Sequence, residues 1–432
     1  MIEPEELKER AGLRRFVSLA TIDTTPLRRH RDFRLLYIGR LISFFGTMIT
    51  MVAIPFQVYE ITRSSLAVGV ISGLEIVPIL GLGFLGGALA DAQDRRRMVQ
   101  ITELALALVS VILVLNAVLP FPRLAVLYAA AVVMAGLDAL QTPSLSAMLP
   151  RLVDRDELIA AAALNSIRTT ASQIAGPAIG GVLVASIGLA NTYVIDVATF
   201  LVSLAALAFM RPVPAPSDAE RPSLRRIKEG VKYARSRQEL MGTYLIDMNA
   251  MFFGMPNALF PALAFRYGGA SVLGLLLAAP AVGSLAAVAT SGWSSRVHRH
   301  GLAIALAAGA WGVAIVGFGL SPNLPLALLC LAVAGGADMI SGIFRGTIWN
   351  QTIPDSLRGR LAGIEMISYS SGPTLGNLEA GAVASAFSLE AAIVSGGVLC
   401  VVGTVLLALR LPGFMRYDNR KDTGPPAGAD RS

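Results

Sequence analysis

Long apolar segments separated by short polar loops run through almost the whole sequence. A helix of about twenty apolar residues is long enough to cross the hydrocarbon core of a bilayer. Segments of this kind are expected at 33–59, 66–90, 98–119, 123–149, 158–188, 190–210, 240–265, 269–294, 300–320, 323–350, 359–387 and 389–411. The chain is therefore predicted to be an all-α membrane protein with 12 transmembrane helices.

The composition agrees with a membrane protein. Of 432 residues, 54% are hydrophobic and only 15% are charged, whereas a soluble chain carries about 25% charged residues. The net charge of +7 is spread over loops and not gathered on one face, so we expect no nucleic-acid partner. Cys330 and Cys400 fall inside apolar spans and the histidines lie in loops, so neither a metal site nor a cofactor is expected.

Basic residues are concentrated in every second loop. One set of loops holds Arg95, Arg96, Arg97, Arg151, Arg155, the cluster from Arg211 to Arg237, Arg296, Arg299, Arg358 and Arg360. The alternate loops hold only Arg63, Arg123 and Arg266. Because cytoplasmic loops carry the excess of Lys and Arg, both termini are predicted to be cytoplasmic, in a multi-pass protein of the inner (plasma) membrane.

The two halves of the chain repeat each other. The sequence from Gly176 to Gly180, with Pro177, recurs from Gly372 to Gly376, with Pro373. The triplet ending at Asp138 likewise recurs at Asp338. Both matches map one span onto the span six places later, which predicts two pseudo-symmetric six-helix bundles.

This repeat divides the chain into five parts. They are a cytoplasmic N-terminal segment (1–32), a first bundle (33–210), a linker (211–239), a second bundle (240–411) and a disordered cytoplasmic tail (412–432). In the linker, Leu224, Ile227 and Val231 recur at helical spacing among basic residues. This pattern predicts an amphipathic helix on the inner membrane surface, with a solvated linker helix as the alternative.

The loop from Gly86 to Arg97 resembles the signature of the major facilitator superfamily. The resemblance runs through Gly87, Leu89, Asp91, Arg95 and Arg96, and the loop departs from the pattern at Ala92 and Asp94. Residues 143–153, 224–235 and 354–360 look like the branch that includes enterobactin exporters. The resemblance implies the major facilitator fold and a secondary active transporter that works by alternating access.

The fifth span resembles the glycine-proline motif of exporters that exchange substrate for protons. The residues that carry it are Gly176, Pro177, Gly180 and Gly181. They make the helix thin and bent, so that it can rock against a neighbour, although ordinary small-residue packing gives the same pattern. In the seventh span, Gly254 and Pro256 are expected to break the helix locally.

Ionisable residues inside the spans are the candidate site residues, since such groups usually face a protein interior or a wet cavity. They are Arg40, Glu75, Asp138, Asp247, Asp338 and Arg345, with Arg168, Glu365 and Glu379 as weaker candidates and Asp196 and Glu103 nearer the span ends. In the fold that the chain resembles, spans one, four, seven and ten line the central cavity. Arg40, Asp138, Asp247 and Asp338 occupy one of these spans each.

Asp138 and Asp338 are the favoured groups for proton coupling, because a carboxyl in such a cavity can load a proton on one side and release it on the other. The alternative is a structural salt bridge. Asp338 and Arg345 are two helical turns apart on one face and can share a network with Arg40.

The loop between the second and third spans has a predicted mechanical role as well. Asp91, with Gly87, Arg95 and Arg96 around it, is expected to meet the N-terminus of the eleventh span near Arg358 and Arg360. Such a latch holds the cytoplasmic side closed until the transporter opens inward. The alternative is that the arginines only fix the topology.

These features favour proton-coupled efflux of a small amphipathic molecule, such as a siderophore or a drug-like compound, by a monomeric transporter. The expected partners are a small-molecule substrate, protons and the lipid bilayer. A proton-coupled or facilitative importer is the alternative. A membrane enzyme or a non-transporting scaffold is disfavoured, because the sequence has no HExxH, GxSxG or Walker motif and keeps ionisable residues in four cavity spans.

Overall fold

The computed structural model describes residues 23–92, 94–213 and 232–420, and for 83–92, 355–360 and 362–370 it describes the backbone alone. Every regular element in these residues is helical. The elements are α2 (Thr25–Arg29), α3 (Arg31–Thr62), α4 (Ser65–Ala92), α5 (Arg95–Ala117), α6 (Leu124–Leu152), η1 (Arg155–Glu157), α7 (Leu158–Ala208), α9 (Gln238–Phe253), η2 (Asn257–Leu259), α10 (Phe260–Tyr267), α11 (Ala270–Ala289), η3 (Ser291–Arg296), α12 (His300–Gly319), α13 (Leu324–Thr352), α14 (Asp355–Ala386), α15 (Leu389–Arg410) and α16 (Pro412–Arg416).

The predicted all-α membrane architecture is confirmed, and each expected span falls on helical residues. Among the described residues, nine helices are long and apolar enough to cross a membrane. Helix α7 counts once, although it contains two expected spans that Gly188 separates with a φ of 79°. A positive φ suits a residue without a side chain, so the glycine marks the turn between the two spans. The number of twelve crossings itself stays a prediction.

The seventh span is broken where the sequence predicted. Helix α9 ends at Phe253, Gly254 follows as its C-cap, and the chain resumes through η2 into α10. The indole Nε1 of Trp311 donates to the carbonyl oxygen of Gly254 at 3.0 Å. This bond satisfies a backbone group that a break at membrane depth leaves without its helical partner.

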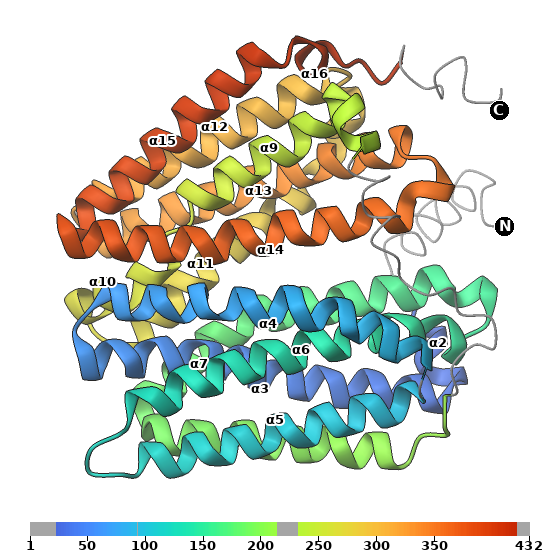
Figure 1. The fold of residues 1–432 in the computed structure, drawn as a ribbon, viewed down its shortest axis with the longest axis vertical. Helices are drawn as coiled ribbons and strands as arrows, with labels where there is room; N and C mark the ends of the chain where they lie inside the picture. The colour runs from blue at the N-terminus through green and yellow to red at the C-terminus, as the bar shows by residue number, and fades with distance from the viewer. Residues whose placement is uncertain (1–22, 93, 214–231, 421–432) are drawn as a thin grey trace, which may run out of the picture.

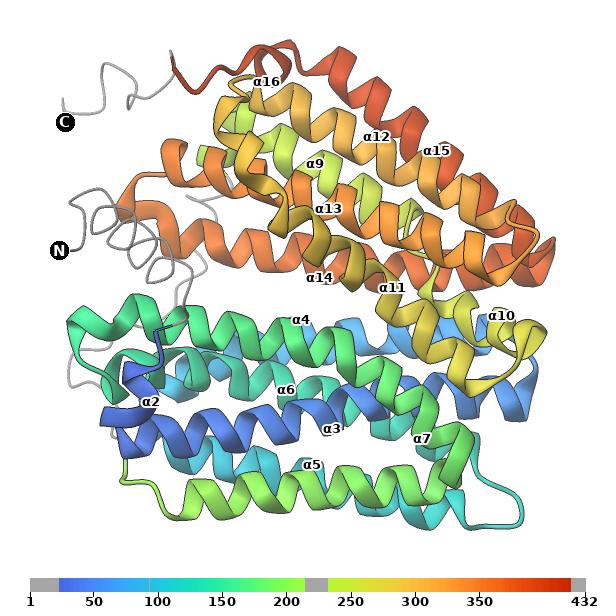
Figure 2. The same ribbon diagram turned by 180° about the vertical axis from the view of Figure 1, so that it is seen from behind.

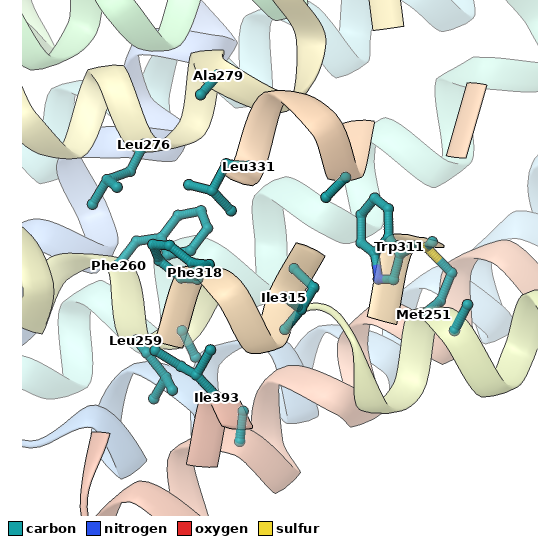
Figure 3. Packing of buried hydrophobic residues seen from close by; sticks show 14 of the residues in the cluster. Met251, Leu259, Phe260, Leu276, Ala279, Trp311, Ile315, Phe318, Leu331 and Ile393 are labelled. Carbon is teal, nitrogen blue, oxygen red and sulfur yellow. The ribbon is translucent and has the colours of Figure 1, made fainter. Parts of the chain in front are cut away.

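The helices form two groups, α2–α7 and α9–α16, which lie one above the other in Figure 1 and, from behind, in Figure 2. They meet along two pairs of helices, α4 with α14 and α7 with α11. Figure 3 shows part of the core in the second group, where the rings of Phe260 and Phe318 pack edge to face with centroids 5.7 Å apart.

The predicted C-terminal disorder is wrong for the first residues of the tail. Helix α16 begins at Pro412, and Phe414 is fully buried. Its ring packs where Gly242 lacks a side chain, and its backbone packs against Gly301. Apolar anchors at Phe414 and Tyr417 therefore order the chain beyond the last span. Residues 421–432, the N-terminal 1–22 and most of the predicted linker helix lie outside the described residues.

Candidate functional site: a cavity between the two halves

A cavity of about 510 Å³ lies between the two groups of helices. Its walls come from α3, α4 and α6 with Leu106 of α5, while η2, α10, α11 and α14 close it from the other half. The polar side chains that line it are Thr47, Thr50, Ser72, Glu75, Asp138, Thr142, Asn257 and Asn377, among mainly apolar residues. A largely apolar cavity of this size with a few polar groups is typical of a small-molecule site.

Two carboxyl groups from different helices share this cavity. Glu75 lies on α4 and has no hydrogen bond or ion pair within the part of the chain that the structure describes. Asp138 lies on α6 and accepts a hydrogen bond from Nε2 of Gln141 at 3.1 Å, and Gln141 in turn accepts one from Thr102 at 3.3 Å. No Arg, Lys or His is among the described residues that line the cavity. The site therefore offers acids without a fixed counter-charge.

The repeat-related acid, Asp338, lies in a different setting. Arg345 forms an ion pair with Asp247 of α9 and a second one with Asp338, at 3.2 Å from Nη2 to Oδ1. Asp247 is buried, Arg345 is mostly covered with 12% of its side chain exposed, and Asp338 is partly exposed. The structure thus brings the predicted site residues Asp247, Asp338 and Arg345 together. They form salt bridges, which was the alternative to a proton-coupling role for Asp338. Buried ion pairs of this kind fix geometry more than they add stability.

Arg40 does not join that cluster. It pairs with Glu103 of α5, which is fully buried and also accepts a bond from Ser43 at 3.4 Å. The sequence interpretation placed Glu103 near the end of its span, yet the residue lies inside α5. Two opposite charges in the first and third apolar spans were a usable signal, because a buried charge requires a partner.

The glycine-proline motif lies at contacts of α7 with both halves. Gly176 and Gly180 pack against Met48 and Ile49 of α3. Gly181 faces Gly274 of α11, where a Cβ on Gly181 would lie 2.8 Å from the Cα of Gly274. Only glycine allows the two halves to come this close.

The halves also contact each other at the end of the molecule that carries α10, opposite the end that carries α2 (Figure 1). Phe265 of α10 stacks on Phe56 of α3, with ring centroids 4.9 Å apart, and lies 5.4 Å from the ring of Tyr59. The guanidinium of Arg63 lies 4.3 Å from the centre of the Phe265 ring. Nearby, Asn377 of α14 donates to Ser72 at 3.4 Å. We call the group Phe56, Tyr59, Arg63 and Phe265 the aromatic clamp.

The structure describes the side chains of only some residues of the predicted latch. The side chains of Asp91, Arg358 and Arg360 lie outside the described residues, and so do the packing contacts of Gly87. Arg95 donates to the carbonyl of Ala147 at 3.0 Å, and Arg96 donates to that of Ala208 at 2.9 Å. These two arginines therefore tie the start of α5 to the ends of α6 and α7.

Asp94, where the loop departs from the superfamily pattern, is the N-cap of α5. Its Oδ1 accepts a hydrogen bond from the backbone N–H of Arg97 at 2.9 Å. A carboxylate at this position satisfies a backbone donor that has no partner within the helix.

Two helical groups that enclose a shared cavity and contact each other at one end define a membrane transporter of the major facilitator superfamily. A family model confirms this class, and the chain belongs to the transmembrane secretion effector family, whose model matches residues 21–426. Proteins of this family are transporters and not enzymes.

Two relatives have names that state a substrate. The enterobactin exporter EntS of Citrobacter koseri is 28% identical over 391 residues, covering 90% of this chain and 94% of the relative. The enterobactin exporter EntS of Shigella boydii is 27% identical over 413 residues, covering 95% and 98%.

Solved structures share the fold at low sequence identity. A peptide transporter, POT, superposes with a TM-score of 0.72 at 13% identity, covering 90% of this chain and 95% of its own. A bacterial homologue of the human lysosomal transporter Spinster, in an inward-facing and unoccupied conformation, has a TM-score of 0.68 at 16% identity, covering 92% and 98%. These likenesses support the fold alone.

Proposed function

We propose that this protein is a proton-coupled exporter that moves a small amphipathic molecule out of the cell by alternating access. The observation that carries the proposal is the cavity between the halves, which contains Glu75 and Asp138. We further propose that the chain works as a monomer in the inner membrane with both termini in the cytoplasm.

The cavity suits an amphipathic ligand. Its apolar walls favour a ring or an alkyl group, while hydroxyl and amide side chains can hydrogen-bond to polar atoms of the ligand. The two acids favour a cationic group or, when protonated, a neutral hydrogen-bond acceptor. Enterobactin, the cargo in the names of the relatives, is the first substrate to test.

The setting of the two acids supports the proposed proton coupling. A carboxylate without a cation is costly at membrane depth, so Glu75 and Asp138 gain by taking up a proton in one conformation. Binding of substrate and binding of protons in the same cavity then compete, which is the requirement for exchange.

Alternating access requires that the contacts at one end of the molecule break when those at the other end form. The aromatic clamp and the Gly181–Gly274 contact are the closed end in this structure. We propose that this end faces the periplasm and that the Asp91 latch closes the opposite end in the other state.

Everted membrane vesicles test the direction of transport, since their cytoplasmic face is outside. With an acidic lumen and radiolabelled enterobactin outside, the exporter is expected to accumulate the label, because protons leave as substrate enters. Vesicles that carry no transporter are the control. Accumulation that occurs only in right-side-out vesicles with protons flowing inward contradicts export and supports the importer.

A further inference from the structure

A buried carboxyl group lies behind the wall of the cavity and is not used by the proposed function. Asp196, in the part of α7 that follows Gly188, is fully buried. It faces α3 at Gly46, where a Cβ would overlap its Oδ1 and the Oγ1 of Thr199. The glycine therefore makes room for an acid between the two helices.

The hydrogen bonds of Asp196 are unevenly divided between its two oxygens. Oδ2 accepts from Thr50 of α3 and from Ser110 of α5, each at 2.7 Å. Oδ1 is buried and has no hydrogen-bond partner within the described residues. Beside it lies Oγ1 of Thr199, whose own hydrogen is donated to the Asp196 backbone carbonyl at 2.7 Å. That hydroxyl oxygen can only accept another hydrogen.

Among the described residues, no cation pairs with this acid. The ion pairs between described residues do not include Asp196, and the neighbouring Arg40 is paired with Glu103. The titratable groups that act on Asp196 are Glu103 from α5, whose charge is also negative, and Tyr193 on its own helix, which donates to Gln57 at 2.9 Å. An isolated carboxylate in a dry interior is so costly that such a group takes up a proton instead.

The hydrogen-bond pattern fits the neutral acid. Two hydroxyl donors on Oδ2 suit a carbonyl oxygen, and an acceptor beside Oδ1 suits a carboxylic O–H. Thr50, one of the two donors, also lines the cavity that holds Glu75 and Asp138. A single hydroxyl therefore separates Asp196 from that cavity, whereas Ser110 is not among the residues that line it.

We propose that Asp196 is a second proton-binding site, loaded from the central cavity through the hydroxyl group of Thr50. A proton from cavity water binds the oxygen of Thr50 as the hydroxyl proton of Thr50 moves onto the Asp196 oxygen that it faces. Rotation of the carboxyl group then turns the new O–H toward Oγ1 of Thr199 and presents the other oxygen, as the carbonyl, to Thr50 and Ser110. Release follows the reverse order. This inference rests on the proposed proton coupling, because it gives the transporter a proton store that the substrate does not touch.

Infrared spectroscopy of the purified protein tests the site without any substrate. At neutral pH, the wild type is expected to show a carbonyl stretch from the protonated carboxyl of Asp196, beside those of any protonated Glu75 and Asp138, and Asp196→Asn is expected to lose this band. The matched variant Asp338→Asn, which alters an acid paired with Arg345, is expected to keep the band. A band that is unchanged in Asp196→Asn overturns the assignment, whether or not the protein transports.

Two hydroxyl variants test the route and keep the test decisive if Asp196→Asn does not fold. Thr50→Val and Ser110→Ala each remove one donor to Oδ2, so each is expected to shift the band. Only Thr50→Val is expected to slow hydrogen–deuterium exchange of the carboxyl, by about tenfold or more, as for loss of a positioned proton donor. An unshifted band in both variants overturns the proton on Asp196. Equal exchange rates in the two variants overturn the route through Thr50.

Discussion

Phe265 provides the sharpest test of the idea that the aromatic clamp holds one end of the transporter closed. Its ring makes two aromatic contacts and one cation–π contact, all with residues of the other half. Aromatic pairs contribute about 0.5–1.5 kcal/mol each, and an exposed cation–π contact contributes about 0.5–1 kcal/mol. Because these contacts link the two halves, Phe265→Ala is expected to act on the conformational equilibrium.

The expected size of the effect follows from these terms. The three contacts together contribute about 1.5–4 kcal/mol, so their loss changes the ratio of closed to open molecules by about 10- to 900-fold. Spin labels at Leu119, after α5, and Leu320, after α12, can report the change, since both side chains are exposed and lie one in each half. Cys330 and Cys400 must first be replaced so that only these two sites are labelled.

Pulsed electron paramagnetic resonance then gives the distribution of distances between the labels. Phe265→Ala is expected to enlarge the long-distance population at the expense of the short one. Phe387→Ala is the matched control, because this ring follows α14 and is 80% exposed. The clamp is refuted by a distance distribution of Phe265→Ala that is identical to those of the Phe387→Ala control and of the labelled protein that keeps both phenylalanines.

Three further variants test separate parts of the structure. Arg345→Ala leaves Asp247 buried without its cation and is expected to cost about 3–5 kcal/mol of stability. The cost is measured as a lower melting temperature in detergent, which the exposed-site control Arg123→Ala is expected not to show. An unchanged melting temperature for Arg345→Ala speaks against the pairing. Gly181→Ala places a methyl group against the backbone of α11 and is expected to weaken the contact between the two halves by about 1–3 kcal/mol, which the distances between the spin labels report. Gly309→Ala, with open space around the glycine, is expected to leave these distances unchanged. Equal effects of the two variants on the distances argue against the close approach. Phe414→Ala removes the buried anchor of the tail at a cost of about 3–5 kcal/mol of stability and is expected to speed proteolysis after α15. The control is Phe209→Ala, because Phe209 is 66% exposed, and it is expected to leave the cleavage rate unchanged. Equal cleavage rates in the two variants count against an ordered tail.

The spans could be predicted because hydropathy and length alone set which residues can cross a bilayer. The break at Gly254 and the turn at Gly188 were also predictable, because glycine and proline have local backbone effects that do not depend on neighbouring helices. Hydropathy shows which span a residue belongs to, but not which neighbouring helix its side chain faces. The pairing of Arg40 with Glu103 and the burial of Asp196 were missed for that reason.

The internal repeat suggested equal roles for Asp138 and Asp338, and the structure gives them different surroundings. Arg345 lies seven residues after Asp338 and pairs with it, while the corresponding position after Asp138 is Leu145. A hydrophobic residue at that position leaves Asp138 without a cation two turns further along its own helix. The repeat therefore predicts where equivalent residues lie, and the neighbours one or two turns away decide what each can do.

The central claim is that Glu75 and Asp138 couple proton movement to export. The direct measurement compares two kinds of transport of labelled enterobactin in everted vesicles: accumulation driven by a pH gradient, and exchange at equal pH. The double variant Glu75→Gln with Asp138→Asn is expected to lose accumulation and keep exchange, while Asp156→Asn, at an exposed position of η1, keeps both. Accumulation by the double variant at the wild-type level would contradict the claim.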